Sequence, residues 1–207
     1  AQQASYTAYL DLGRFAVCSA SPELFLGLDG ERLWSKPMKG TIERGRDATT
    51  DEQNRLALYH SDKNRAENVM IVDMIRNDMG RVCRTGSVQV PQLFATEPYP
   101  TLWQMTSTVT GQSAAPLSDI LAAMFPCASI TGAPKVRTMA IIRGLESRPR
   151  TLYTGSIGYL APGRQAQFNV AIRTALVDRE AGQARYHVGS GIVWDSDAAA
   201  EWQECLL

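Results

Sequence analysis

Residues 24–36 read Leu-Phe-Leu-Gly-Leu-Asp-Gly-Glu-Arg-Leu-Trp-Ser-Lys, and this stretch decides the fold class. Its two predicted strands, 24–28 and 32–36, flank Asp29-Gly30, a dipeptide that favours the tight turn of a β-hairpin. Another hairpin is predicted just before it, over 5–10 and 14–19 around Leu12-Gly13. The chain therefore begins as antiparallel sheet.

Working outward, further strands and helices alternate in blocks rather than one by one. Strands are predicted over 88–90, 102–110, 154–160, 167–177 and 184–194. Helices are predicted over 51–79, 117–125 and 135–145, and from Ser196 or Asp197 onward. This pattern favours an α+β fold of mostly antiparallel sheets flanked by helices, not a doubly wound parallel sheet. Without a repeat or a linker, residues 1–207 are predicted to form one domain.

Composition excludes several classes of protein. The 207 residues are 44% hydrophobic and 20% charged, which is typical of a folded globular chain and excludes a disordered one. The 21 Lys and Arg balance the 21 Asp and Glu, so no net charge attracts nucleic acid or an anionic membrane. No apolar run approaches the roughly 20 residues of a membrane span. We therefore expect a cytoplasmic protein that binds neither nucleic acid nor membrane.

Cysteine and histidine are too few and too scattered for most metal or triad chemistry. The cysteines contain no CxxC pair, so four reduced thiols are expected rather than a zinc site or a disulfide framework. The chain has two histidines. The residues concerned are Cys18, Cys83, Cys127, Cys205, His60 and His187.

Two segments could bind an anionic ligand. In Lys36-Pro-Met-Lys-Gly-Thr41, Gly40 lets the backbone approach a ligand with Lys39 beside it, although a solvent-facing lysine is the simpler interpretation. In Ser129-Ile-Thr-Gly-Ala-Pro-Lys135, the residues before Pro134 precede a helix whose free N–H groups attract anions. An ordinary capped helix fits that second segment equally well.

Other segments suggest a close ligand and a divalent cation. Gly189 and Gly191 interrupt a strand pattern, which indicates a bulge or a closely approaching ligand. Glu201 and Glu204 share one helix face, and Glu67 precedes an apolar helical stretch. Together these carboxylates would suit Mg²⁺ rather than zinc. Taken singly, each is more often a solvated helix carboxylate.

In their order along the chain, eight segments resemble one family, the chorismate-utilising enzymes. They are SPELF (21–25), PMKGT (37–41), DKNRAENVMIVDMIRND (62–78), SITGAPKVRTM (129–139), GSIGYL (155–160), AIRTA (171–175), GSGIVWDSD (189–197) and EWQE (201–204). The resemblance implies the C-terminal catalytic portion of that fold, an incomplete copy without the N-terminal portion and the end of the last helix. We expect the 207-residue piece alone to be inactive.

Lys39 points to one branch of the family. Anthranilate and isochorismate synthases usually carry Ala at this position, whereas Lys resembles component I of aminodeoxychorismate synthase. That branch converts chorismate and ammonia, supplied by a glutamine amidotransferase subunit, to 4-amino-4-deoxychorismate for p-aminobenzoate and folate synthesis. The alternatives are component I of anthranilate synthase and an inactive chorismate-binding module.

The same resemblance implies a role for each matched residue. Lys39 would be the nucleophile, and Glu23 the general acid that protonates the departing hydroxyl. Glu67 and Glu204 would hold Mg²⁺ with Glu201 close by. Gln104 stands where many relatives have His, and glutamine cannot titrate. Chorismate would be bound by Arg173, Tyr153, Gly40, Thr41, Thr131, Gly132, Gly189 and Gly191.

Overall fold

The computed structural model describes residues 4–194 and 196–206, except for the side chain of Glu204. The strands are β1 (Tyr6–Leu12), β2 (Phe15–Ser21), β3 (Leu24–Asp29), β4 (Arg32–Lys36), β5 (Met38–Glu43), β6 (Gln89–Pro98), β7 (Leu102–Gln112), β8 (Ser156–Ala161), β9 (Gln165–Val170), β10 (Thr174–Asp178) and β11 (Gln183–Tyr186). The helices are α1 (Ala48–Tyr59), α2 (Asp62–Gly80), α3 (Leu117–Met124), α4 (Ala128–Thr131), α5 (Lys135–Leu145) and α6 (Ala198–Leu206).

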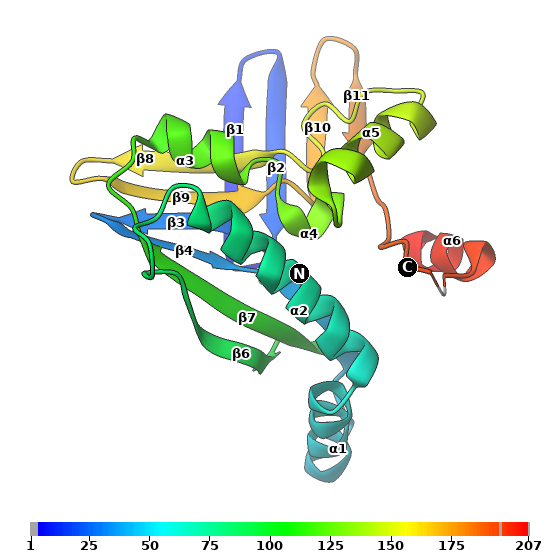
Figure 1. Ribbon diagram of the computed structural model, residues 1–207. Helices are drawn as coiled ribbons and strands as arrows, with labels where there is room; N and C mark the ends of the chain where they lie inside the picture. Colours follow the sequence, from blue (N-terminus) through cyan, green and yellow to red (C-terminus); the bar gives the residue numbers. More distant parts are fainter. Residues whose placement is uncertain (1–3, 195, 207) are drawn as a thin grey trace.

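Two sheets organise the molecule (Figure 1). The larger has the strand order β5-β7-β4-β3-β9-β8, with β6 on the other edge of β7, and the smaller has the order β1-β2-β10-β11. Every strand pair in the described part of the chain is antiparallel. The predicted α+β class is therefore confirmed.

Both predicted hairpins are present, and so are most of the predicted helices. The turns pass through Gly13 and Gly30, whose φ angles of +74° and +58° suit glycine. Helices 117–125 and 135–145 appear as α3 and α5, and Asp197 caps α6 by accepting bonds from the amides of Ala199 and Ala200. All four cysteines are free thiols, as expected.

The single helix expected over 51–79 is wrong, because the chain breaks into α1 and α2 at residues 60–61. Asp47 caps α1 by accepting bonds from the amides of Thr49 and Thr50. Ser61 caps α2, with its hydroxyl accepting a bond from the amide of Asn64. A side-chain cap satisfies amides that no helical carbonyl reaches, so each helix has its own start.

Three strand predictions are also wrong in extent. The strand at 88–90 continues through Pro91 as β6, which tolerates proline because β6 pairs only with β7 and forms a sheet edge. The strand at 167–177 divides at residues 171–173, where the chain crosses from the larger sheet to the smaller. The strand at 184–194 ends at Tyr186, so Gly189 and Gly191 lie in irregular backbone. Neither β5 nor α4 was expected.

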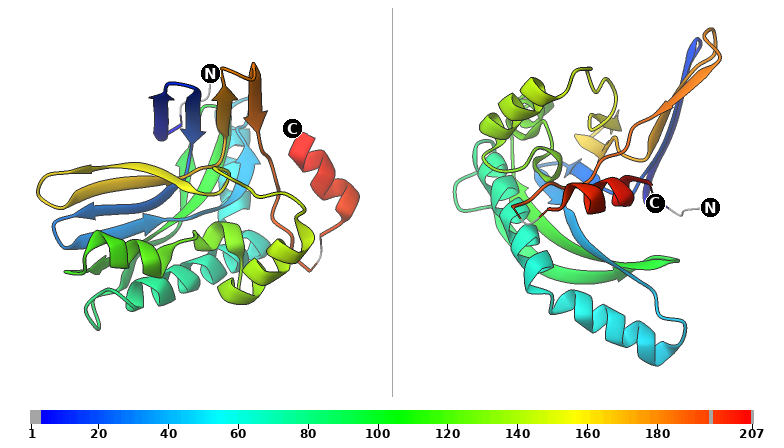
Figure 2. Two further views of the ribbon diagram at one scale, coloured as in Figure 1. Left: turned by 90° about the horizontal axis from the view of Figure 1, so that it is seen from above. Right: turned by 90° about the vertical axis from the view of Figure 1, so that its right-hand side faces the viewer.

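The main core lies between the larger sheet and the helices that cover one of its faces, α2, α3 and α4 (Figure 2). Leu26 and Leu33 of the sheet are fully buried there, together with Met79 of α2 and Ile120 of α3. Burial of such side chains contributes about 1.5–3 kcal/mol each. The apolar side chains that recur every three to four residues along the helices, and every second residue along the strands, thus lie in one layer.

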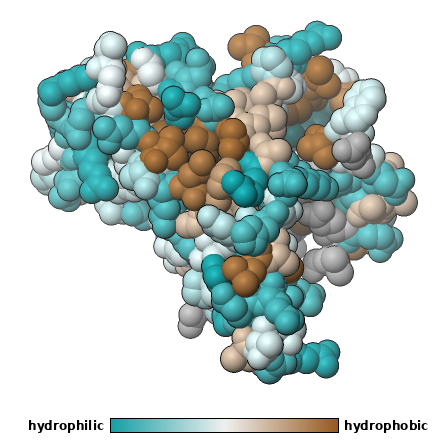
Figure 3. Space-filling view, turned by 60° about the horizontal axis from the view of Figure 1, so that its bottom comes forward, coloured by the Kyte–Doolittle hydropathy of each residue, from teal (hydrophilic) through white to brown (hydrophobic). Residues whose placement is uncertain are grey.

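In contrast, α5 has no buried side chain, and its Val136 and Leu145 are 83% and 80% exposed. Figure 3 shows apolar patches separated by hydrophilic side chains on one face of the molecule. No single helix in the described ranges is long and apolar enough to cross a membrane. Leu117–Thr131 and Lys135–Leu145 reach that length and composition only as a pair bent by 64°.

The chain crosses between the two sheets twice, and the crossings lie side by side. One crossing follows β2 and contains Glu23, and the other follows β9 and contains Arg173. The amide of Ala20 donates to the Arg173 carbonyl at 3.0 Å, and the amide of Val170 donates to the Glu23 carbonyl at 3.1 Å. The fold therefore brings together two site candidates that are 150 residues apart in the sequence.

Candidate active site

Lys39 lies in a β-bulge of β5. Met38 pairs with Thr106 and Thr41 pairs with Gln104, so three steps along β5 match two along β7. The extra residue re-aims the side chains of the strand. A methyl group on the Cα of Gly191 would lie 3.8 Å from Lys39 Nζ, so the amine reaches the glycine-rich segment after β11.

Glu23 is buried beside this lysine. Glu23 is only 5% exposed. Among the described residues, its Oε1 has no hydrogen-bond partner. Burial raises the pKa of Glu23 to about 6, against the opposing effects of the Ser129 hydroxyl, the positive charge of Lys39 and the Met38 amide. A carboxyl with this pKa can hold or release a proton near neutral pH.

The segment from α4 to α5 lies next to Glu23 and supplies Ser129, Thr131 and Gly132. The Thr131 hydroxyl donates to the Cys127 carbonyl at 3.2 Å, and Gly132 has a φ of +83°. Pro134, the N-cap residue of α5, makes no side-chain hydrogen bond to the first turn, and an anion site at these amides stays a prediction. Burial, with the nearby Glu23 charge, raises the pKa of the Cys127 thiol to about 12, which makes it an inert neighbour.

Tyr153 faces the glycine-rich segment. A methyl group on Gly189 would lie only 2.8 Å from the Tyr153 hydroxyl, so glycine is required for this approach. The Tyr153 ring makes an edge contact with His187 at 5.5 Å between centroids. Burial raises the pKa of Tyr153, which keeps its hydroxyl protonated as a hydrogen-bond donor.

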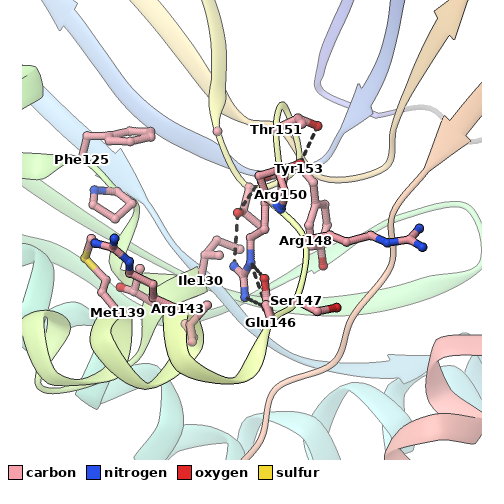
Figure 4. A pocket seen from close by; sticks show the side chains of 16 residues that line it. Phe125, Ile130, Met139, Arg143, Glu146, Ser147, Arg148, Arg150, Thr151 and Tyr153 are labelled. Carbon is pink, nitrogen blue, oxygen red and sulfur yellow. Dashed lines mark hydrogen bonds and ion pairs between the residues drawn. The ribbon is translucent and has the colours of Figure 1, made fainter.

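A cavity of about 460 Å³ opens between α5 and residues 146–155 (Figure 4). Two predicted substrate residues, Thr131 and Tyr153, line it, whereas Lys39, Glu23 and Arg173 do not. The Arg150 guanidinium is paired with Glu146 at 2.6 Å. The cavity therefore adjoins one side of the predicted site rather than enclosing all of it.

Arg173 has an exposed side chain and a φ of +49°. A non-glycine residue in this left-handed region costs about 1–3 kcal/mol, and such strain concentrates at functional positions. The bend places Arg173 at the sheet crossing, where its carbonyl accepts from the amide of Ala20 on β2. A guanidinium at this position can pair with a carboxylate of a ligand.

The predicted metal residues come from two helices that approach each other. The pKa of Glu201 on α6 is lowered chiefly by hydrogen bonds from Ser190 and Ser196, with a further contribution from the positive charge of Lys63. Because Lys63 is one turn before Glu67, α6 faces the part of α2 that carries Glu67 (Figures 1 and 2). Glu67 is half-buried.

One carboxylate oxygen of Glu201 is buried and has no partner among the described residues. Oxygen ligands of this kind suit Mg²⁺, so the donor chemistry fits the expected ion. The described side chains contain no cluster of three His, Cys, Asp or Glu. The third predicted ligand, Glu204, lies on α6, and its side chain is outside the described part of the structure.

The sequence reasoning missed two polar residues of the site and misjudged a third. Ser129 and Ser190 hydrogen-bond to Glu23 and Glu201, yet serine in a turn segment gives no signal beyond ordinary capping. Lys135 belongs to the segment predicted to bind an anion. Its amine is instead paired with Asp78 at 2.5 Å and donates to the Met124 carbonyl at 2.9 Å. This lysine is therefore committed to holding α5 against α2.

Comparisons with known proteins identify relatives of the whole chain. The chain is 45% identical over 206 residues to aminodeoxychorismate synthase component 1 of Escherichia coli, covering 99% of this chain and 45% of that protein. It is 46% identical to a probable chloroplastic aminodeoxychorismate synthase of rice, of which it covers 23%. The chain thus spans less than half the length of these relatives.

Solved structures give the same result. Anthranilate synthase component I from Streptococcus pneumoniae superposes with a TM-score of 0.88 at 33% identity, over 98% of this chain and 45% of that one. The menaquinone-specific isochorismate synthase MenF of Escherichia coli superposes with a TM-score of 0.83 at 27% identity, over 93% of this chain and 44% of the other. A family model described as chorismate binding enzyme matches residues 1–207. The chain belongs to the chorismate-binding enzyme family.

Proposed function

We propose that this chain carries the catalytic site of an aminodeoxychorismate synthase component 1, which converts chorismate and ammonia to 4-amino-4-deoxychorismate and water. The observation that carries the proposal is the placement of Lys39 beside the buried carboxyl of Glu23. Curated relatives that match 99% of the chain support it by their names. An unpaired buried carboxylate oxygen is costly to the fold, which argues against an inactive binding module.

Substrate binding would use the residues around this pair. Chorismate is a dicarboxylate, and Arg173 offers a planar fork for one carboxylate. The Tyr153 hydroxyl, which lies next to Gly189, would donate a hydrogen bond to the substrate. Gly189 and Gly191 leave room for the ligand next to the backbone. Thr131 and Gly132 adjoin the first turn of α5.

The reaction needs Lys39 neutral and Glu23 protonated. Transfer of one proton from the Lys39 ammonium to the Glu23 carboxylate gives both reactive forms, and burial of Glu23 favours its neutral form. The Lys39 amine then bonds to the ring as the hydroxyl C–O bond breaks, and Glu23 protonates the departing oxygen, which leaves as water. The proton of the alkylated amine returns to Glu23.

Ammonia completes the cycle by displacing the lysine. A new C–N bond forms between ammonia and the ring while the bond to Lys39 breaks, and one ammonia proton moves to the lysine nitrogen. Glu67, Glu201 and Glu204 would hold Mg²⁺, which would neutralise and orient a chorismate carboxylate. The unpartnered oxygen of Glu201 supports this assignment.

The partners follow from the same proposal. The name "component 1" of the bacterial relative indicates a second component in that system. We propose that a glutamine amidotransferase subunit supplies ammonia here, and that the product serves p-aminobenzoate and folate synthesis. The cytoplasmic location stays a prediction.

The experiment replaces Lys39 with alanine in the complete protein and follows chorismate plus ammonium by mass spectrometry. The variant should form no 4-amino-4-deoxychorismate, because no other side chain would supply the nucleophile. Lys36→Ala is the matched control, since Lys36 ends the preceding strand and pairs with Glu97 at 2.6 Å. Wild-type protein incubated with chorismate but without ammonium should carry an adduct on Lys39 equal to chorismate minus one water.

Each alternative predicts a different product. Anthranilate made by the wild-type protein would identify the anthranilate synthase alternative. Binding of chorismate with no product and no Lys39 adduct would identify an inactive module. Wild-type turnover that survives in Lys39→Ala would show that another group is the nucleophile.

A further inference from the structure

The bulge that carries Lys39 is held by the side chain of one residue, Gln104 on β7. Gln104 is only 8% exposed. Its Nε2 donates to the Gly40 carbonyl at 2.8 Å, and its Oε1 accepts from the Thr41 hydroxyl at 3.0 Å. The two bonds end on Gly40 and Thr41, the first and second residues after Lys39. A bulge interrupts the strand ladder, and a side chain that reaches the freed carbonyl restores a buried hydrogen bond.

We propose that Gln104 is a positioning residue that fixes the direction of the Lys39 amine. The proposal rests on the proposed function only for the role of Lys39 as nucleophile. Its chemistry requires an amide, because a single side chain must donate to Gly40 and accept from Thr41 at the same time. Leucine can do neither, and an ionised glutamate can only accept.

The opposite side of the bulge is braced by α2. Gly40 has a φ of +94°, and a methyl group on it would lie 3.0 Å from the Asn64 side chain. Asn64 is itself held, since its Nδ2 donates to the hydroxyl of Ser61, the residue that caps α2, at 3.0 Å. The backbone at Gly40 is therefore confined between Gln104 and Asn64. This confinement leaves Lys39 directed toward Gly191, where its amine is found.

The test compares Gln104→Leu and Gln104→Glu in the complete protein, with ammonium as nitrogen donor. Gln112→Leu and Gln112→Glu are matched controls, because Gln112 is an exposed glutamine at the end of the same strand. We expect kcat to fall about 10- to 100-fold in the Gln104 variants, since small displacements of a reacting group have effects of this size. The KM for chorismate should change less than kcat, because Arg173, Tyr153 and the glycine-rich segment are not held by Gln104.

A second measurement follows Lys39 without catalysis. Acetic anhydride labels lysine amines, and mass spectrometry gives the labelling rate of Lys39 relative to Lys36 in the same molecule. The Gln104 variants should change this ratio, while their thermal unfolding temperature tells whether the fold is intact. Thr41→Val removes one of the two bonds and should produce a smaller change in both kcat and labelling. If Gln104→Leu does not fold, Gln104→Glu and Thr41→Val decide the outcome.

The results separate this proposal from the proposed function. Wild-type kcat and an unchanged labelling ratio in folded Gln104 variants would overturn the positioning role. A parallel loss of kcat and thermal stability with an unchanged labelling ratio would also overturn it, because Gln104 would then be structural only. If the wild type makes no 4-amino-4-deoxychorismate but the labelling ratio still changes, the proposed function fails and the positioning stands.

Discussion

At the scale of single residues, the role proposed for Glu23 would oppose the stability of the fold. Its pKa rises from the ordinary value of 4.5 to about 6 because the carboxyl is buried. The folded state therefore binds this proton more tightly than the unfolded state does. The stabilisation that results is fully present below pH 4.5 and is lost as the pH rises through about 6. Above that pH, the buried carboxylate lowers the free energy of unfolding.

Glu23→Gln removes this charge and keeps the shape of the side chain. A shift from 4.5 to about 6 corresponds to about 2 kcal/mol, so the variant should be more stable than the wild type by about that amount at pH 8. The difference should shrink to near zero at about pH 3, where the wild-type carboxyl is protonated in both states. Urea unfolding at the two pH values measures it. If Glu23→Gln and the wild type were equally stable at pH 8, the Glu23 carboxylate would have to be solvated despite its burial.

Catalysis should move in the opposite direction. The same variant cannot protonate the departing hydroxyl, so its turnover should fall by about 10²- to 10⁴-fold. An exposed carboxylate elsewhere serves as control: Glu180→Gln, in the turn between β10 and β11, loses only a surface ion pair with Arg14, so stability should change by less than about 1 kcal/mol and the rate should not change. More stable protein with lower activity is the signature expected of a strained functional group.

At the scale of elements, a buried ion pair ties α5 to α2. Lys135, in the first turn of α5, pairs with Asp78 in the last turn of α2, and their side chains are 15% and 8% exposed. Burial raises the pKa of Asp78 despite this partner. The pair therefore depends on both members, because either charge left alone would be buried without compensation.

Lys135→Met should lower the free energy of unfolding by about 3–5 kcal/mol at pH 7, the usual effect of leaving one buried charge unpaired. The double variant Lys135→Met/Asp78→Leu should recover most of that loss. Because the unpaired Asp78 can be neutralised by protonation, the loss in the single variant should diminish as the pH falls toward 4. Urea unfolding of the wild type, Lys135→Met, Asp78→Leu and the double variant measures the coupling free energy between the two charges. Additive effects in the double variant would show that the two charges do not interact.

The elements also show how far the sequence determines the structure. Hairpins were predictable because their turns are local, as Asp29-Gly30 illustrates. The break between α1 and α2 was not, since it depends on Ser61 as a cap and on Asn64 packing against Gly40, a contact between separate elements. Helical periodicity continues on both sides of residues 60–61 and gives no sign of the break.

The candidate site likewise contains parts that the sequence predicts and parts that it does not. Ordered motifs predicted Lys39 and Glu23 as site residues and, by resemblance, most of the residues around them; these roles stay predictions. The bulge around Lys39 could not be predicted, because it arises from the pairing of residues 38–41 with 104–106, far apart in the chain. The prediction of one strand over 167–177 was wrong for a related reason. The apolar pattern is continuous there, but the chain changes sheets at 171–173, between β9 and β10.

At the scale of the whole molecule, the site is assembled from parts that the core holds unequally. Glu23 and Arg173 lie where the two sheets meet, and Glu67 lies on α2, which packs on the main core. Glu201 lies on α6, which follows the irregular residues 187–194 and has no buried side chain among its described residues. A ligand that bridges these parts would stabilise α6 more than the sheets, because binding favours the conformation that makes the contacts.

Hydrogen exchange should reveal this difference. Chorismate together with Mg²⁺ should slow amide exchange in residues 187–194 and in α6 by at least about tenfold, whereas β3 and β9 in the core should change little. Chorismate or Mg²⁺ alone should have a smaller effect, because magnesium in proteins is usually shared between carboxylates and an anionic ligand. Glu201→Gln and Glu67→Gln should each abolish the extra protection, and Glu180→Gln should retain it.

The pattern of protection decides which contacts form. Protection of α6 that needs both ligands and both glutamates would place the cation between α2 and α6, as the mutual approach of Lys63 and Glu201 indicates. Full protection by chorismate alone, unaffected by either glutamine variant, would mean that the carboxylates are not metal ligands. The unpartnered oxygen of Glu201 would then need a partner other than a cation, because the Ser196 hydroxyl already donates to the other oxygen.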